Sequence, residues 1–101
     1  MKGIIVLFFI GFISYNTFSQ TYKGIVYDEN SMPLPYANVA LMTKDSLLLT
    51  GGTTNLDGYF EISYDKQDVY LLKFSYIGYK TIYQKASSSE RLMVKLDADE
   101  I

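Results

Sequence analysis

The stretch with the most recognisable chemistry is Asn55–Gly58 (Asn-Leu-Asp-Gly), whose side-chain oxygens and backbone carbonyls suit a hard cation such as calcium. A complete loop of the EF-hand type places a bidentate Glu at its twelfth position. Counted from Thr53 as position one, the twelfth residue is Tyr64, and position one is Thr instead of Asp. We therefore interpret Asn55–Gly58 as a hairpin turn in which Gly58 takes a positive φ, and we predict no metal site.

The residue types that most often carry catalysis are missing, since the chain has no His, no Cys and no Trp. Without His there is neither a Ser-His-Asp relay nor a His-ligated zinc, and without Cys there is neither a thiolate nucleophile nor a disulfide. Asp28 and Asp57 both fall in predicted turns, where we expect them to accept backbone hydrogen bonds instead of forming a catalytic pair. We predict no catalytic residue and no cofactor, and hence no enzyme.

Nine of the ten tyrosines follow residue 20, and a face of exposed tyrosines could stack against sugar rings. Side-chain alternation turns Tyr70 and Tyr76 toward the predicted core. Four others are expected to be exposed, namely Tyr27, Tyr36, Tyr64 and Tyr83. Because aromatic residues favour strands in any case, a glycan-binding face is the less favoured interpretation.

The first twenty residues have the three parts of a secretory signal peptide. Lys2 gives a positive start, Ile4–Ile13 is apolar, and Thr17–Ser19 places small residues at positions −3 and −1 of a cut before Gln20. A membrane span needs about 20 apolar residues, roughly twice the length of this run. We predict a signal peptide over residues 1–20 and an exported mature chain that begins at Gln20 or Thr21.

The charge of the chain excludes one further class of function. From Thr21 onward there are 8 Lys and Arg residues against 11 Asp and Glu residues, so the predicted mature net charge is 8 − 11 = −3. A binder of nucleic acid needs a basic field, which this chain does not have. We therefore expect no nucleic-acid partner and no membrane span of the mature chain's own.

These candidate residues must be positioned by strands, because hydrophobicity after residue 20 alternates with a period of two. Seven strands are predicted, at Tyr22–Asp28, Ala37–Met42, Leu47–Thr54, Tyr59–Ser63, Val69–Tyr76, Tyr79–Gln84 and Leu92–Leu96. Phe60 and Ile62 are expected to face inward and Tyr59 outward, and Gly51-Gly52 predicts a bulge or a close backbone approach. Short strands separated by turns indicate one all-β sandwich domain over residues 21–97, with residues 98–101 as the start of a linker or a truncated end.

Three stretches in this order carry a family resemblance: Gly24–Asp28 leading to Pro33–Val39, then Gly51–Phe60, then Leu72–Lys80. Together they resemble the carboxypeptidase regulatory-like domain, a transthyretin-like (prealbumin-like) seven-stranded Greek-key β-sandwich. The resemblance covers about residues 21–97. Ser31 departs from it, since the pattern usually has Gly there, and this difference implies another local turn within the same fold.

The resemblance also implies a role. In Bacteroidota such domains often follow a signal peptide as the N-terminal periplasmic extension of TonB-dependent receptors and related outer-membrane β-barrel proteins. We therefore expect a non-catalytic module with a structural or protein-interaction role, located in the periplasm or at the outer membrane and with protein partners there. It is expected to be either a fragment of such a protein or a stand-alone domain. The alternative is a secreted binding domain for a glycan or a cell-surface partner. The zinc-dependent activity of carboxypeptidases is excluded because the chain has no His.

Overall fold

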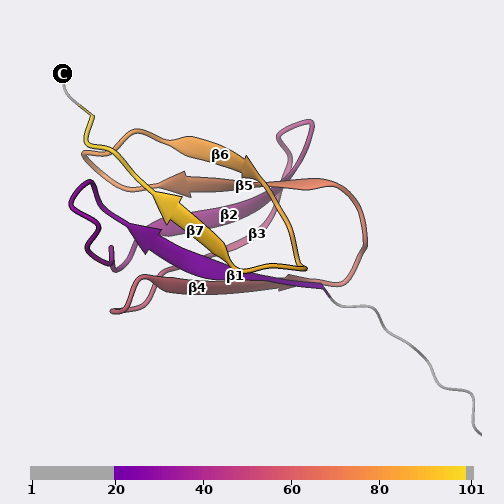
Figure 1. Ribbon diagram of the computed structural model, residues 1–101. Helices are drawn as coiled ribbons and strands as arrows, with labels where there is room; N and C mark the ends of the chain where they lie inside the picture. Colours follow the sequence, from indigo (N-terminus) through magenta and orange to yellow (C-terminus); the bar gives the residue numbers. More distant parts are fainter. Residues whose placement is uncertain (1–19, 100–101) are drawn as a thin grey trace, which may run out of the picture.

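The computed structural model describes residues 20–99, and every regular element in this part of the chain is a β-strand (Figure 1). The strands are β1 (Gln20–Tyr27), β2 (Asn38–Thr43), β3 (Leu48–Thr53), β4 (Tyr59–Tyr64), β5 (Tyr70–Ser75), β6 (Ile82–Lys85) and β7 (Leu92–Lys95). The predicted number of strands is therefore confirmed. Residues 20–99 contain no helix with the length and apolar character of a membrane span. The predicted signal peptide falls on residues 1–19, outside the described residues.

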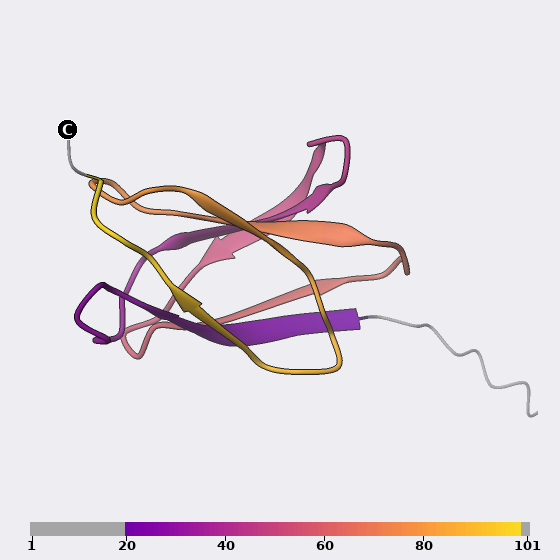
Figure 2. The ribbon, with the colours of Figure 1, turned by 45° about the horizontal axis from the view of Figure 1, so that its top comes forward.

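The strands form two facing sheets, with the orders β4-β1-β7 and β3-β2-β5-β6 (Figures 1 and 2). All pairings are antiparallel except that of β1 with β7, which runs parallel from Gly24 opposite Leu92 to Tyr27 opposite Lys95. The chain crosses between the sheets after β1, β3, β4 and β6. This arrangement confirms the predicted all-β sandwich.

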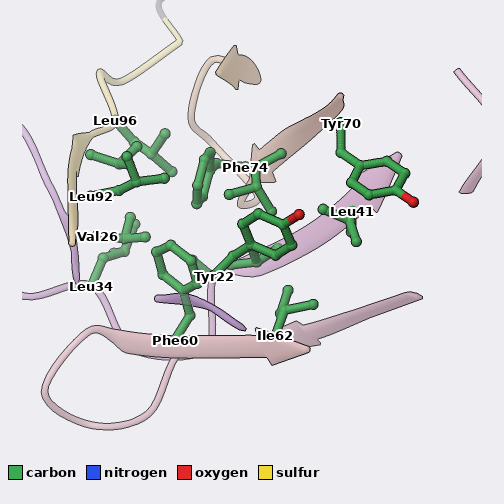
Figure 3. Close-up of a cluster of buried hydrophobic side chains, with 14 residues drawn as sticks. Tyr22, Val26, Leu34, Leu41, Phe60, Ile62, Tyr70, Phe74, Leu92 and Leu96 are labelled. Atoms are coloured by element: carbon green, nitrogen blue, oxygen red, sulfur yellow. The ribbon is translucent and has the colours of Figure 1, made fainter. Parts of the chain in front are cut away.

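The core lies between the two sheets and is filled by the inward side chains of each strand (Figure 3). Phe60 of β4 and Phe74 of β5 meet edge to face across the sheets, with ring centroids 5.3 Å apart. Phe60 and Ile62 are buried and Tyr59 is half-buried, which confirms the register predicted for β4. The buried apolar side chains are Tyr22, Val26, Leu34, Ala37, Val39, Leu41, Phe60, Ile62, Tyr70, Leu72, Phe74, Leu92, Val94 and Leu96.

The glycine pair of β3 allows a close backbone approach, as predicted, but the bulge lies elsewhere. The pairing of β2 with β3 shifts beside Met42, where Leu49 is the extra residue. A Cβ atom at Gly51 would lie 2.9 Å from the Val39 carbonyl oxygen, whereas one at Gly52 would meet nothing within 4 Å. Only the first glycine is therefore required by a neighbouring strand.

Three tyrosines differ from their predicted positions. Tyr27, predicted to be exposed, is half-buried in β1. Tyr64, predicted to be exposed, packs against the core, and its ring meets that of the buried Tyr70 edge to face at 5.6 Å. The physical reason is that Tyr64 continues the inward alternation of Phe60 and Ile62 along β4. Tyr76, predicted to be a core residue, lies just beyond the end of β5, where it is half-buried and packs against the edge of the core.

The end of the chain also differs from the prediction. The sixth strand begins at Ile82 and not at Tyr79, because Tyr79 forms an isolated antiparallel bridge with Ala98. The Asp99 N–H donates to the Gly78 carbonyl at 2.9 Å. Ala98 and Asp99, which we predicted to begin a linker, are thus paired with the turn between β5 and β6, and residues 100–101 lie outside the described residues.

Candidate functional site

One end of the sandwich, which we call the loop end, gathers four segments, namely residues 28–37, 54–58, 76–80 and 97–99 (Figures 1 and 2). Hydrogen bonds connect them. The Tyr36 N–H donates to the Thr54 carbonyl at 3.0 Å, and the Tyr79 hydroxyl donates to the Glu29 carboxylate at 3.1 Å. A surface built on segments that are tied together in this way is preorganised, so a partner would lose little free energy in ordering it.

In the Asn55–Gly58 turn, the candidate calcium loop, the side-chain oxygen of Asn55 accepts hydrogen bonds from the backbone of the turn itself. The Asn55 Oδ1 accepts from the N–H groups of Asp57 (2.9 Å) and Tyr59 (3.0 Å), and Gly58 has the predicted positive φ, at 74°. The expectation that Asp57 accepts backbone hydrogen bonds is wrong for the described turn, because Asn55 fills that role. Within residues 20–99, no group of three or more His, Cys, Asp or Glu side chains lies close enough to hold a metal ion.

Asp28 has the predicted role in its turn. Its Oδ1 accepts from the N–H groups of Asn30 (2.8 Å) and Met32 (2.9 Å). Ser31 adopts φ 62°, in the left-handed region that favours glycine. Ser31 therefore has the backbone conformation that Gly would adopt at this position without steric cost. The Asp28 carboxylate is therefore a structural acceptor in this turn.

A strained turn at the start of β2 presents an aromatic side chain. Pro35 and Tyr36 are its central residues, and Tyr36 has φ 64° with 61% of its surface exposed. A bulky residue in this backbone region costs about 1–3 kcal/mol, and such strain persists only where the surroundings impose it. The structure thus holds Tyr36 outward at an energetic cost, which is a feature that functional sites often share.

The buried hydroxyl of Thr54 holds this turn in place. Its Oγ1 donates to the Leu34 carbonyl at 2.6 Å and accepts from the Ala37 N–H at 2.9 Å, thereby bridging the two ends of the turn. Thr54 is only 1% exposed. The sequence analysis missed this residue, because a Thr at the end of a predicted strand looks like any other strand residue. The one available signal was Pro35, which favours the second position of a turn.

Tyr79 connects two segments of the loop end through its hydroxyl. Burial, followed by the hydrogen bond to Glu29, raises the pKa of the Tyr79 phenol above its ordinary value. Its ring also lies against that of Tyr76, with centroids 5.8 Å apart. A phenol with a raised pKa stays protonated at neutral pH, so this group acts as a hydrogen-bond donor and not as a base.

The loop end exposes several large apolar side chains. Its four large exposed side chains are Met32 (59%), Tyr36 (61%), Leu56 (71%) and Ile77 (89%). Such side chains on a rigid end of a sandwich favour contact with another protein surface. The surface of residues 20–99 has no pocket.

The tyrosines considered for sugar stacking are not brought together. Tyr36 and Tyr83 are exposed, but Tyr83 lies within β6, whereas Tyr36 precedes β2. Tyr27 is half-buried in the opposite sheet, and Tyr64 belongs to the edge of the core. The four side chains therefore do not form one stacking face.

The seven strands in two sheets define a β-sandwich domain. The chain belongs to the CarboxypepD_reg-like domain family, whose family model matches residues 22–100. The match covers almost all of the described residues and confirms the predicted resemblance. A search among curated proteins finds no match.

Proposed function

We propose that this protein is a non-catalytic interaction module of the periplasm that contacts a protein partner through the loop end, and that it serves as the N-terminal extension of a TonB-dependent receptor or related outer-membrane β-barrel protein. The observation that carries the interaction role is the exposed apolar set of the loop end, presented by segments that hydrogen bonds hold in place. Family membership supports the non-catalytic part of the proposal.

The charge of the loop end indicates the chemistry of the partner. Asp57 and Asp99 lie on its segments, and the Asp28 carboxylate lies in its first turn. A complementary surface would combine an apolar hollow that receives Ile77 or Tyr36 with basic residues around it. A glycan is less well suited, because the exposed tyrosines are separated.

The location in the periplasm rests on the sequence. The apolar run Ile4–Ile13 and the small residues of Thr17–Ser19 support export, and the resemblance of the domain supports an outer-membrane context. Gln20 already belongs to β1, where it is opposite Tyr64, so a cut before Gln20 would leave the first strand whole.

Site-specific photo-crosslinking in cells tests this function. A photoreactive amino acid at Ile77 should crosslink to one discrete protein of the outer membrane or periplasm. The same group at Val69, which is 51% exposed but belongs to the β4–β5 connection outside the loop end, is the matched control. Equal crosslinking from both positions, or recovery of the protein from the cytoplasm with Met1 intact, would contradict the proposal.

A further inference from the structure

The free edge of β3 differs from the other three sheet edges of the described domain. β3, β6, β4 and β7 are the outer strands of the two sheets. Glu61 lies in β4, Lys85 in β6 and Lys95 in β7, and such charges discourage pairing with another strand. β3 (Leu48–Thr53) has no charged residue, and neither does the longer stretch from residue 46 to residue 56.

The backbone of β3 is available for a further strand. The Thr54 N–H donates to the Ala37 carbonyl of the segment leading into β2. Because hydrogen bonding alternates along an antiparallel ladder, Gly52 also faces β2, whereas Gly51 and Thr53 direct their N–H and carbonyl groups away from the sheet. An edge of this kind accepts an added strand through main-chain hydrogen bonds.

We infer that the occupant of this edge is a second copy of the same chain, paired antiparallel through β3 about a twofold axis at Gly51. In this register Gly51 lies opposite Gly51 of the second copy and Gly52 lies opposite Thr50, and the regular part of the ladder ends at the bulge beside Leu49. Glycine at the axis leaves no pair of side chains facing each other across the new ladder at that point. The two four-stranded sheets become one continuous sheet of eight strands.

The exposed leucines around β3 make the edge self-complementary. Leu47 and Leu48 at its start are 63% and 62% exposed, and Leu56 just after its end is 71% exposed. Antiparallel pairing about Gly51 brings the start of one β3 to the end of the other. Leu47 of one copy and Leu56 of its partner then lie at the same end of the new ladder, so each copy covers apolar surface of the other.

Charge favours this occupant over a self-pairing at any other edge. Within Leu48–Thr53, two copies joined through β3 place no like charges opposite one another, and the acidic residues nearest to the strand in sequence, Asp45 and Asp57, lie in the turns on either side of it. The interface is a single strand and its flanking leucines, so it belongs to the small and weak class of interfaces. We expect a dimer that forms between micromolar and near-millimolar concentration. Leu56 belongs both to this pairing and to the loop end, whereas Met32, Tyr36 and Ile77 take no part in the pairing and stay free for the partner of the loop end.

Sedimentation of the protein of residues 20–101 tests the inference. This form includes every core residue of the described domain and leaves out the apolar run Ile4–Ile13. We expect a reversible monomer–dimer equilibrium. The change Gly52→Lys, at a position with open space around it, places a charge next to the axis and should weaken the dimer by at least about tenfold, which is roughly 1.4 kcal/mol.

The matched control is Tyr83→Lys in β6, at the other edge of the same sheet, which should leave the dimer unchanged. Since the chain has no Cys, Gly52→Cys and Tyr83→Cys can be compared with a short bis-maleimide, and only the first should give a covalent dimer. Circular dichroism confirms that each variant is folded. A monomer at every concentration, or a dimer that both lysine variants weaken equally, overturns the inference. Neither result bears on crosslinking from Ile77, so the two proposals can fail separately.

Discussion

Replacing Thr54 with Val tests whether one buried hydroxyl holds the Tyr36 turn. Val has nearly the shape of Thr, so the change removes the hydroxyl and adds no cavity. The Ala37 N–H and the Leu34 carbonyl then lose the partner that bridges them at 2.9 Å and 2.6 Å. Ala37 is fully buried and Leu34 is 7% exposed, so water cannot readily replace the hydroxyl.

The expected cost follows from the two groups left without a partner. A buried donor or acceptor that loses its hydrogen bond costs about 1–3 kcal/mol, so Thr54→Val should lower the free energy of unfolding by about 2–4 kcal/mol. That is a large part of the about 5–15 kcal/mol expected for a whole domain. Thr54→Ser keeps the hydroxyl and removes only a methyl group, and should cost about 1 kcal/mol.

Urea denaturation of the protein of residues 20–101 measures these changes. The matched control is Thr53→Val, since Thr53 is exposed and should change stability by less than about 0.5 kcal/mol. If Thr54→Val is as stable as Thr53→Val, or if Thr54→Ser is as damaging as Thr54→Val, the hydroxyl does not support the turn and the reasoning fails.

Three further predictions concern the core and the loop end. Phe60→Ala should cost about 3–5 kcal/mol in denaturant titrations, and it should be clearly more damaging than Tyr59→Ser; the reverse order would contradict the register of β4. Gly58→Val should cost at least about 1–3 kcal/mol from its positive φ, because its Cβ would also approach the Val26 carbonyl oxygen to 2.6 Å; an unchanged unfolding midpoint would show that the turn relaxes freely. Because the pKa of Tyr79 is raised in the folded state, its contribution is complete below the unfolded pKa near 10 and is lost as pH rises through the folded value, so stability should fall at alkaline pH, less steeply in Tyr79→Phe; identical pH profiles would refute this.

The strands and the core could be predicted because alternation is a local signal. Phe60 and Ile62 are inward, as their spacing indicates, and Gly58 has the positive φ that its turn requires. The same signal places Tyr64 inward, but the predicted strand ends at Ser63, one residue before the end of β4. Alternation therefore shows whether a side chain points inward or outward only when the residue at which the strand ends is known.

The loop end could not be predicted to the same extent, because long-range contacts determine it. The Thr54 hydroxyl forms hydrogen bonds with the backbone of Ala37 and Leu34, seventeen and twenty residues away in sequence. The bridge between Tyr79 and Ala98 likewise depends on the β5–β6 turn meeting the end of the chain. No local pattern reports such pairings, whereas each of the turns at Asp28 and Asn55 is formed within a few residues and was recognisable from composition.

The parallel pairing of β1 with β7 has a mechanical consequence. β1 begins at the end of the sandwich away from the loop end, and β7 runs toward the loop end (Figure 1). A pull between the start of β1 and the end of β7 therefore slides the two strands along one another. All hydrogen bonds of the ladder then bear the force together, from Gly24 to Tyr27 and including the bond from the Leu96 N–H to the Tyr27 carbonyl. In a hairpin pulled from its open end, by contrast, the hydrogen bonds break one after another. The domain is thus built to resist tension applied through its own two ends.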